Sequence, residues 1–174
     1  MKALITGIAG TGKTTILAEL QSQGYVVIDL DATGMCRWKD KETGEVTEYG
    51  EVGRDYEWLT KHGWYCDIDT LKKLLSCMRE DKDVFVAVIT ENIGEVANEF
   101  DRVFILNTDD AVVKDRLNRR TNNHFAKKEE EQDFVLEHSK ELLKRVNNQI
   151  SVDANQTPNE IADNILNSLS KDVS

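Results

Sequence analysis

The stretch that decides the fold is Gly7-Ile8-Ala9-Gly10-Thr11-Gly12-Lys13-Thr14, close to the N-terminus. Residues 2–6 before it form a short, mostly apolar run that predicts a strand. After it, Ile16, Leu17 and Leu20 recur at the spacing of one helix face. Glycine suits the turn between them because it adopts backbone angles that other residues reach only at a cost. The segment therefore predicts a strand, a glycine-rich turn and a helix.

The alternation of strand and helix continues along the chain. Further strands are expected over 25–31, 84–89, 103–106 and 149–153, and helices over 69–78, 93–100, 109–120, 134–146 and 157–169. Residues 84–89 are apolar without interruption, which indicates burial on both faces of the sheet. The pattern predicts a three-layer α/β fold, with a parallel sheet between two layers of helices and ligands at the carboxyl ends of the strands.

Two helix starts carry local signals. Asp69 is expected to cap the helix over 69–78, because an aspartate before an apolar helix face accepts from free backbone amides. Thr157-Pro158-Asn159-Glu160 has the pattern of a capping box with proline at the first helical position.

Composition limits the class of protein. The 174 residues are 40% hydrophobic and 31% charged, which is typical of one folded domain spanning residues 1–174. A net charge of −10 disfavours nucleic acid and anionic membranes as partners. No apolar stretch reaches the length of a signal sequence core or a membrane span, so a cytoplasmic protein is expected. Either a monomer or a homodimer is expected. The cysteines are expected to be free, and none of the histidines is expected to bind metal; these residues are Cys36, Cys66, Cys77, His62, His124 and His138.

The glycine-rich turn matches the pattern G-x-x-x-x-G-K-[ST] of a phosphate-binding loop, in the structural context that this motif requires. Glycines let backbone amides surround phosphate oxygens, and the helix N-terminus adds the positive end of a dipole. Lys13 is expected to reach the β and γ phosphates, and the Thr14 hydroxyl to coordinate Mg²⁺. The sequence therefore predicts ATP and Mg²⁺ as cofactors, with a nucleotide site formed by Gly7, Ala9, Gly10, Thr11, Gly12, Lys13, Thr14 and Thr15.

Two further segments give the chain a family resemblance. With Asp29-Leu30-Asp31 after the second strand and the run 116–120 (Arg-Leu-Asn-Arg-Arg) after the fourth, it resembles the P-loop small-molecule and nucleotide kinases, such as the adenylate and shikimate kinases. The resemblance covers nearly the whole chain, although only the phosphate loop is highly specific. It implies a five-stranded sheet in the order 2-3-1-4-5 and a mobile lid, here residues 119–130. Residues 88–92 lack the motifs that both named groups carry there, so the acceptor is not identified.

The resemblance also implies roles for residues near the nucleotide. Arg116 would lie near the adenine, and Arg119 or Arg120 would approach the transferred phosphoryl group. Ala154 and Asn155 would place backbone against the adenine base. Each has a plainer interpretation: the arginines also complement a helix dipole, and residues 153–158 also suit an ordinary capped connection.

Asp29 and Asp31 are the candidate catalytic carboxylates. At i, i+2 on a strand, both side chains are expected on one face, at the carboxyl end beside the phosphate loop. One of them could accept the acceptor's proton, and Asp31 could also join Thr14 at the metal. A pair of solvated acids at a strand end is the alternative.

Residues 32–67 interrupt the strand and helix rhythm and hold all three tryptophans. We interpret this insert as the acceptor site for a planar or sugar-like group, with Arg37, Trp38, Arg54 and Asp31 as contacts. The alternative is a small aromatic core beneath a long loop. Residues 41–46 predict a turn within it.

These features favour a kinase that transfers the terminal phosphoryl group of ATP to a nucleoside, nucleotide or other small metabolite. Lys13, Asp29, Asp31, Arg119 and Arg120 would be its catalytic residues. The alternative is a P-loop NTPase or nucleotide-gated regulatory module without a small acceptor. A polynucleotide kinase is disfavoured because the chain lacks a long basic track.

Overall fold

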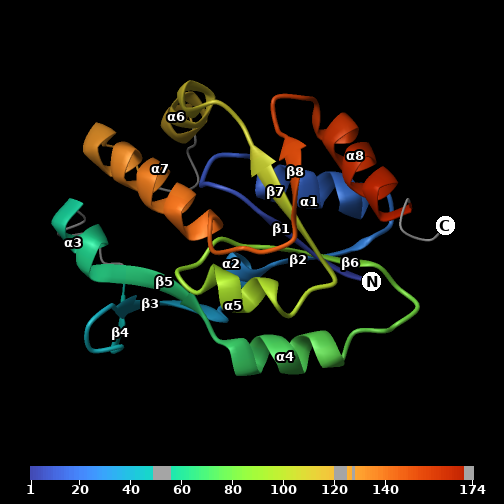
Figure 1. The fold of residues 1–174 in the computed structure, drawn as a ribbon, viewed down its shortest axis with the longest axis horizontal. Coiled ribbons are helices and arrows are strands. Elements are labelled where there is room, and N and C mark those ends of the chain that lie inside the picture. Colours follow the sequence, from blue (N-terminus) through green and yellow to red (C-terminus); the bar gives the residue numbers. More distant parts are fainter. Residues whose placement is uncertain (49–55, 120–124, 127, 171–174) are drawn as a thin grey trace.

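The computed structural model describes residues 1–48, 56–119, 125–126 and 128–170. Its centre is a five-stranded parallel sheet (Figure 1), which consists of β1 (Lys2–Thr6), β2 (Val26–Asp29), β6 (Val84–Ala87), β7 (Arg102–Asn107) and β8 (Gln149–Asp153). The strands lie in the order β2-β6-β1-β7-β8. Counted along the chain, this is the expected order 2-3-1-4-5. It brings the carboxyl ends of β1 and β6 together at the phosphate loop.

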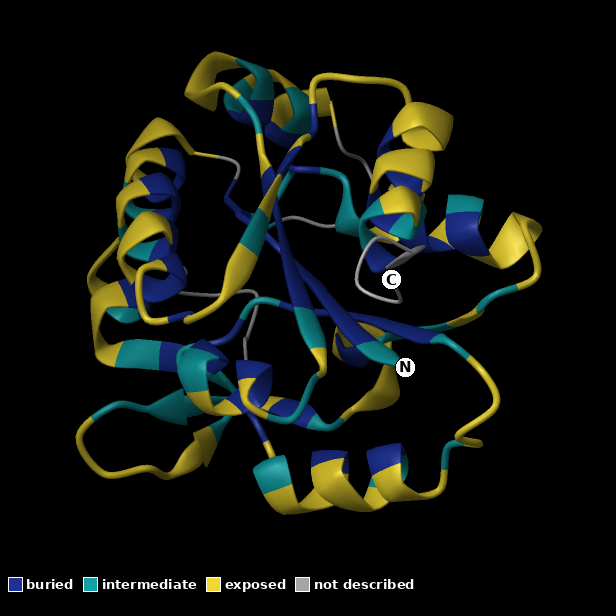
Figure 2. Ribbon diagram, turned by 45° about the vertical axis from the view of Figure 1, so that its right-hand side comes forward, coloured by how far each residue is buried: buried dark blue, intermediate teal, exposed yellow. Residues whose placement is uncertain are grey.

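Helices cover both faces of the sheet, which confirms the three-layer α/β fold. On one face, α1 (Lys13–Ser22) and α8 (Pro158–Ser170) pack over Ile5, Phe85 and Phe104. The other face buries Leu4, Val86 and Ile105 under α4 (Ile68–Ser76), α5 (Ile93–Ala97), α6 (Asp110–Arg119) and α7 (Glu129–Leu143). Neighbouring residues of one strand thus enter different cores, which explains the uninterrupted apolar runs (Figure 2).

Several element boundaries differ from the sequence expectations. Asp67, not Asp69, caps α4, because its side chain accepts from the Thr70 amide. Helix α7 begins earlier than expected, at Glu129, where three glutamates in the first turn suit the helix dipole. The capping box before α8 is confirmed: Glu160 Oε2 accepts from the amide and the hydroxyl of Thr157.

The insert folds as a small antiparallel sheet, which the sequence analysis did not anticipate. Its strands are β3 (Cys36–Asp40), β4 (Val46–Thr47) and β5 (His62–Cys66), in the order β4-β3-β5, with α3 (Tyr56–Lys61) before β5. The expected turn within 41–46 joins β3 to β4. Cys36 and Cys66 lie opposite each other in the β3–β5 ladder and are buried and free, while Cys77 is exposed and free.

Within the described ranges, no helix has both the length and the apolarity that a membrane crossing requires.

Candidate functional site

The phosphate loop joins β1 to α1 in a tight turn. Gly10 and Gly12 have φ of 92° and 102°, a region that favours glycine. A side chain at Gly7 would not fit, because its Cβ would lie 2.8 Å from the Leu106 carbonyl oxygen. Among the described residues, no side chain caps the start of α1, so its first amides are available to phosphate oxygens.

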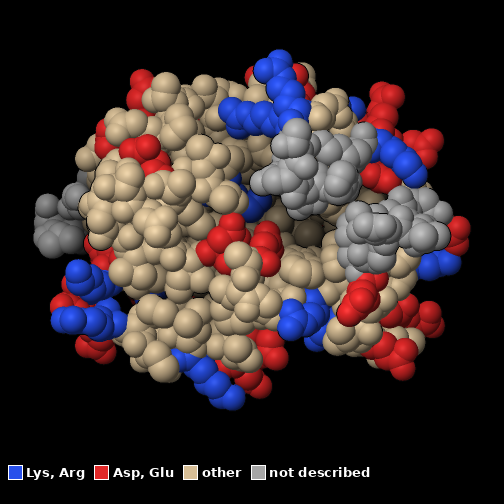
Figure 3. Space-filling view, turned by 180° about the vertical axis from the view of Figure 1, so that it is seen from behind, with Lys and Arg blue, Asp and Glu red and all other residues tan. Residues whose placement is uncertain are grey.

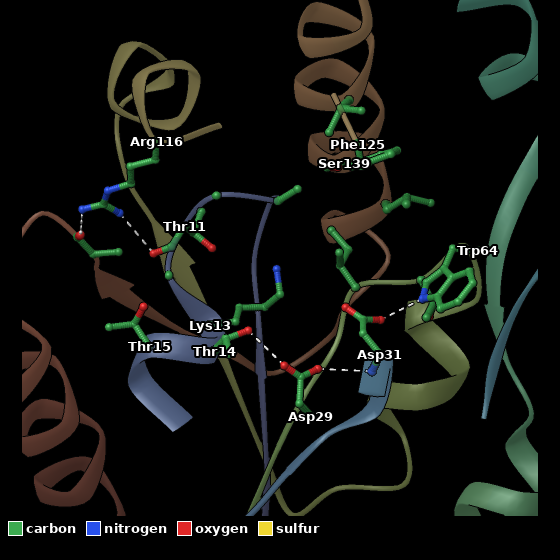
Figure 4. A pocket seen from close by; sticks show the side chains of 18 of the residues that line it. Thr11, Lys13, Thr14, Thr15, Asp29, Asp31, Trp64, Arg116, Phe125 and Ser139 are labelled. Atoms are coloured by element: carbon green, nitrogen blue, oxygen red, sulfur yellow. Dashed lines mark hydrogen bonds between the residues drawn. The ribbon is translucent and has the colours of Figure 1, made fainter. Parts of the chain in front are cut away.

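Lys13 and Thr14 stand at the start of α1, as the motif requires. The Lys13 ammonium donates to the carbonyls of Gly7 and Ile8 at 2.8 and 3.3 Å, which holds it over the loop. The Thr14 hydroxyl donates to Asp29 Oδ2 at 2.9 Å (Figure 4). A hydroxyl beside a carboxylate fits Mg²⁺, which usually takes one or two protein oxygens and completes its shell with phosphates and water.

The two aspartates differ in position from the sequence expectation. Strand β2 ends at Asp29, and Asp31 belongs to the short helix α2 (Leu30–Thr33), so they do not share a strand face. The reason is local: Asp29 Oδ1 accepts from the Asp31 amide and caps α2. Both carboxylates nevertheless face the same cavity. Asp29, rather than Asp31, contacts Thr14.

Asp31 is held from the insert side. Its Oδ1 accepts from the Trp64 indole nitrogen at 2.8 Å. Solvent reaches the carboxylate through the cavity, but protein surrounds it on most sides, and this desolvation raises its pKa. The Trp64 hydrogen bond and the charge of Lys13 oppose that rise, while the negative charge of Asp29 adds to it.

Arg116 of α6 lies between the phosphate loop and the segment after β8. Its guanidinium donates to the carbonyls of Thr11 and Ala154, each at 3.2 Å. Arg116 and Ala154 thus meet on the wall of the same cavity, and their place near an adenine base stays a prediction. The Asn155 side chain instead bonds to Asp153 and Thr108 and lies outside that wall.

A cavity of about 1060 Å³ connects these groups. It runs from the phosphate loop past Asp29 and Asp31 to the insert and α7. Figure 3 shows a hollow in one face of the molecule, with acidic side chains at its edge. Within the described residues, no three histidine, cysteine, aspartate or glutamate side chains gather as metal ligands.

The aromatic residues of the insert meet around Trp38. Its ring centroid lies 5.1 Å from that of Trp58, 5.5 Å from that of Trp64 and 6.1 Å from that of Phe125. Trp38, Trp64 and Phe125 line the cavity, whereas Trp58 lies outside its wall and stacks on His62. The cluster is therefore both a small core and part of the cavity wall.

The sequence analysis missed Glu91, which follows β6. Glu91 Oε1 lies 3.0 Å from Lys41 Nζ and 2.6 Å from His138 Nε2, and the side chain is only 11% exposed. Burial on its own would raise the pKa of Glu91, but the hydrogen bonds and charges of His138 and Lys41 outweigh it and hold the pKa low. Glu91 and His138 both line the cavity. Glu91 lies two residues beyond the apolar run 84–89, and a charged residue so close to the end of a buried strand was the one available signal.

The structure does not bring every expected residue to the cavity. Arg37 is exposed, donates to the Cys36 carbonyl and lies outside the cavity wall. Arg119 is also exposed and pairs with Asp115. Arg54 and Arg120 lie outside the described residues, as does much of the lid expected over 119–130.

Comparisons with known proteins agree with this architecture. A family model described as an AAA domain matches residues 4–137, well over half of the chain. No curated protein has a significantly similar sequence.

Three solved structures with a similar fold have low sequence identity to this chain. A shikimate kinase from Acinetobacter baumannii in complex with shikimate has a TM-score of 0.63 at 19% identity, over 98% of this chain and 93% of that one. A deoxyadenosine kinase from M. mycoides with bound dATP has a TM-score of 0.59 at 16% identity, over 98% of this chain and 100% of that one. A gluconokinase from Sinorhizobium meliloti 1021 has a TM-score of 0.55 at 15% identity, over 98% of this chain and 91% of that one. The chain therefore belongs to the AAA domain family and has the fold of the P-loop small-molecule kinases.

Proposed function

We propose that the chain is a kinase that uses ATP and Mg²⁺ to phosphorylate a hydroxyl group of a small acceptor. The observation that carries this proposal is the cavity that joins the phosphate loop to Asp29, Asp31 and the insert. An NTPase without an acceptor needs room for nucleotide and water alone. Here the cavity continues beyond the carboxylates into an aromatic wall.

The residues divide the chemistry between them. The acceptor oxygen attacks the γ phosphorus, the bond from that phosphorus to the bridging oxygen breaks, and ADP leaves. Lys13 and the amides of the loop stabilise the charge on the phosphates. Asp31, held by Trp64, orients the acceptor hydroxyl and takes its proton. Thr14 and Asp29 hold Mg²⁺, which supplies charge neutralisation at the phosphates.

Acceptor-dependent turnover of ATP across a panel of hydroxylated metabolites tests the proposal. The expected result is ADP formation that requires both Mg²⁺ and one class of acceptor. Slow hydrolysis that no acceptor accelerates would instead identify an NTPase or a nucleotide-gated module.

Lys13→Ala tests the site assignment. It should reduce turnover by a factor of about 10² or more, since it removes the loop's own point charge from the phosphates. Lys72→Ala is the matched control. Lys72 is a half-exposed lysine of α4 that pairs with Glu99, which follows α5. Wild-type turnover by the Lys13 variant would remove the phosphate loop from the reaction.

A further inference from the structure

We propose that the acceptor is an uncharged molecule with a planar ring, of the nucleoside class, rather than a sugar acid or a nucleoside monophosphate. This inference rests on the proposed function and narrows its substrate. Two independent observations carry it: the charges on the acceptor side of the cavity, and the rings that line it.

The charges favour an uncharged acceptor. Among the described residues that line the cavity, the lysine and arginine side chains are those of Lys13 and Arg116. Both belong to the nucleotide end: Lys13 lies over the phosphate loop, and Arg116 bonds to the backbone of Thr11 and Ala154. Among the described residues of the cavity wall, an acceptor carboxylate or phosphate would find no lysine or arginine beyond these two.

The acceptor side is instead acidic. Glu91 is matched by Lys41 and His138. Among the described residues, Asp29 and Asp31 accept hydrogen bonds from Thr14, the Asp31 amide and the Trp64 indole, and the basic side chain whose charge acts on Asp31 is Lys13, at the nucleotide end. A second anion within about 5 Å of such a carboxylate is repelled strongly enough to weaken binding on the order of a hundredfold. The charges of the described residues on this side of the cavity therefore favour an acceptor without an acidic group.

The rings favour a planar acceptor. Trp38 and Trp64 come from the insert, Phe125 from the segment before α7, and Phe134 and His138 from α7. Phe134 and His138 are stacked on each other, with ring centroids 5.2 Å apart. Aromatic side chains that line a cavity are a usual device for holding a base, because every base presents a flat face.

The acidic side chains and the aromatic wall meet at Asp31, close to the phosphate loop. The Trp64 indole binds Asp31, so the edge of the aromatic wall touches the carboxylate nearest the acceptor. In Figure 4, Asp31 lies between Trp64 and Lys13, so a ring against Trp64 would leave an attached sugar at Asp31, with its hydroxyl toward the phosphate loop. The cavity of about 1060 Å³ exceeds the range of about 300–1,000 Å³ that is usual for one ligand, which suits two ligands side by side.

Tryptophan fluorescence titration without ATP tests the inference separately from catalysis. The probes are adenosine, deoxyadenosine, cytidine and thymidine, compared with their 5′-monophosphates, shikimate and gluconate. We expect at least one nucleoside to bind saturably and to be phosphorylated, with the monophosphate bound at least about tenfold more weakly. Trp38→Leu should weaken nucleoside binding at least about tenfold, whereas Tyr65→Leu, which alters an insert aromatic outside the cavity wall, should not.

Asp31→Asn tests the charge argument. Removing the carboxylate should reduce the preference for nucleoside over monophosphate, measured as the ratio of the two dissociation constants. An unchanged ratio would contradict the argument from charge.

The outcomes separate this inference from the proposed function. Phosphorylation of shikimate, gluconate or a monophosphate with all nucleosides inert overturns the inference and leaves the kinase; loss of that activity in Arg54→Ala or Arg120→Ala would identify the missing basic partner. Nucleoside binding that depends on Trp38 but yields no phosphorylated product overturns the kinase and keeps the ligand class. Failure of every nucleoside to bind overturns the inference.

Discussion

The Glu91 ion pairs offer the sharpest test of how the cavity is held together. Glu91→Gln keeps the size of the side chain and removes its charge. Loss of one partner from a buried ion pair costs about 3–5 kcal/mol. Lys41 and His138 are 26% and 27% exposed, and glutamine still accepts one hydrogen bond, so we expect a smaller loss of about 1–3 kcal/mol.

Thermal unfolding measures this loss directly. A domain of this size changes its Tm by about 2–4 °C per kcal/mol, so a loss of about 2 kcal/mol lowers it by about 4–8 °C. Glu57→Gln is the control, because Glu57 pairs with Lys61 on the surface at 72% and 62% exposure. Such a pair contributes at most about 0.5 kcal/mol. Equal Tm values for the two variants would refute the reasoning.

The same variant has a predictable dependence on pH. The pKa of Glu91 is held below its ordinary value of 4.5, so its ionised form stabilises the folded state. That contribution is complete above the unfolded pKa and is lost as pH falls through the folded one. The difference in stability between wild type and Glu91→Gln should therefore shrink below a pH of about 4.5. A difference that stays constant into acid would contradict the assigned charge.

Three further predictions concern neighbours of this site. The Thr90 hydroxyl is buried and has no hydrogen-bond partner in the described part of the chain, so Thr90→Val should leave the free energy of unfolding within about 1 kcal/mol of wild type, or raise it. A large decrease in the free energy of unfolding, measured by denaturant titration, would mean that the Thr90 hydroxyl does make a hydrogen bond. A Cβ at position 63 would lie 2.4 Å from Glu91 Cγ, so Gly63→Ala should displace Glu91 and cost about 1–3 kcal/mol by the same measurement, and an unchanged Tm would contradict this. Trp64→Phe removes a hydrogen bond that lowers the pKa of Asp31, so the acid limb of turnover should move to higher pH; a limb that stays in place would exclude Asp31 as the titrating base.

Local sequence signals predicted the parts of the fold that depend on local physics. The phosphate loop and the Thr157–Glu160 capping box could both be predicted from the sequence, because each motif places specific residue types at a fixed spacing. The strand order came from the family resemblance rather than from any residue pattern, and the structure has it.

The acceptor side of the cavity was harder to predict from the sequence, because segments that are distant along the chain form it. Lys41, Glu91 and His138 are far apart in the sequence, and no spacing rule brings them together. Strand periodicity also placed Asp29 and Asp31 on one face, because it does not register that an aspartate can cap the next helix. In the insert, the aromatic content pointed to the cavity, but the antiparallel pairing that presents Trp38 and Trp64 was not expected.

The contacts from Thr14 through Asp29 and Asp31 to Trp64 form a continuous chain of hydrogen bonds between α1 and the insert. A metal ion bound at Thr14 would compete for the Asp29 oxygen that accepts the Thr14 hydrogen bond. Asp29 also caps α2, the helix that carries Asp31. A nucleotide and an acceptor bound as proposed would share one set of bonds, so each would change the affinity of the other by the same factor. Under the proposed function, the binding of nucleotide and the binding of acceptor would thus be coupled through four residues, with no movement of a domain required.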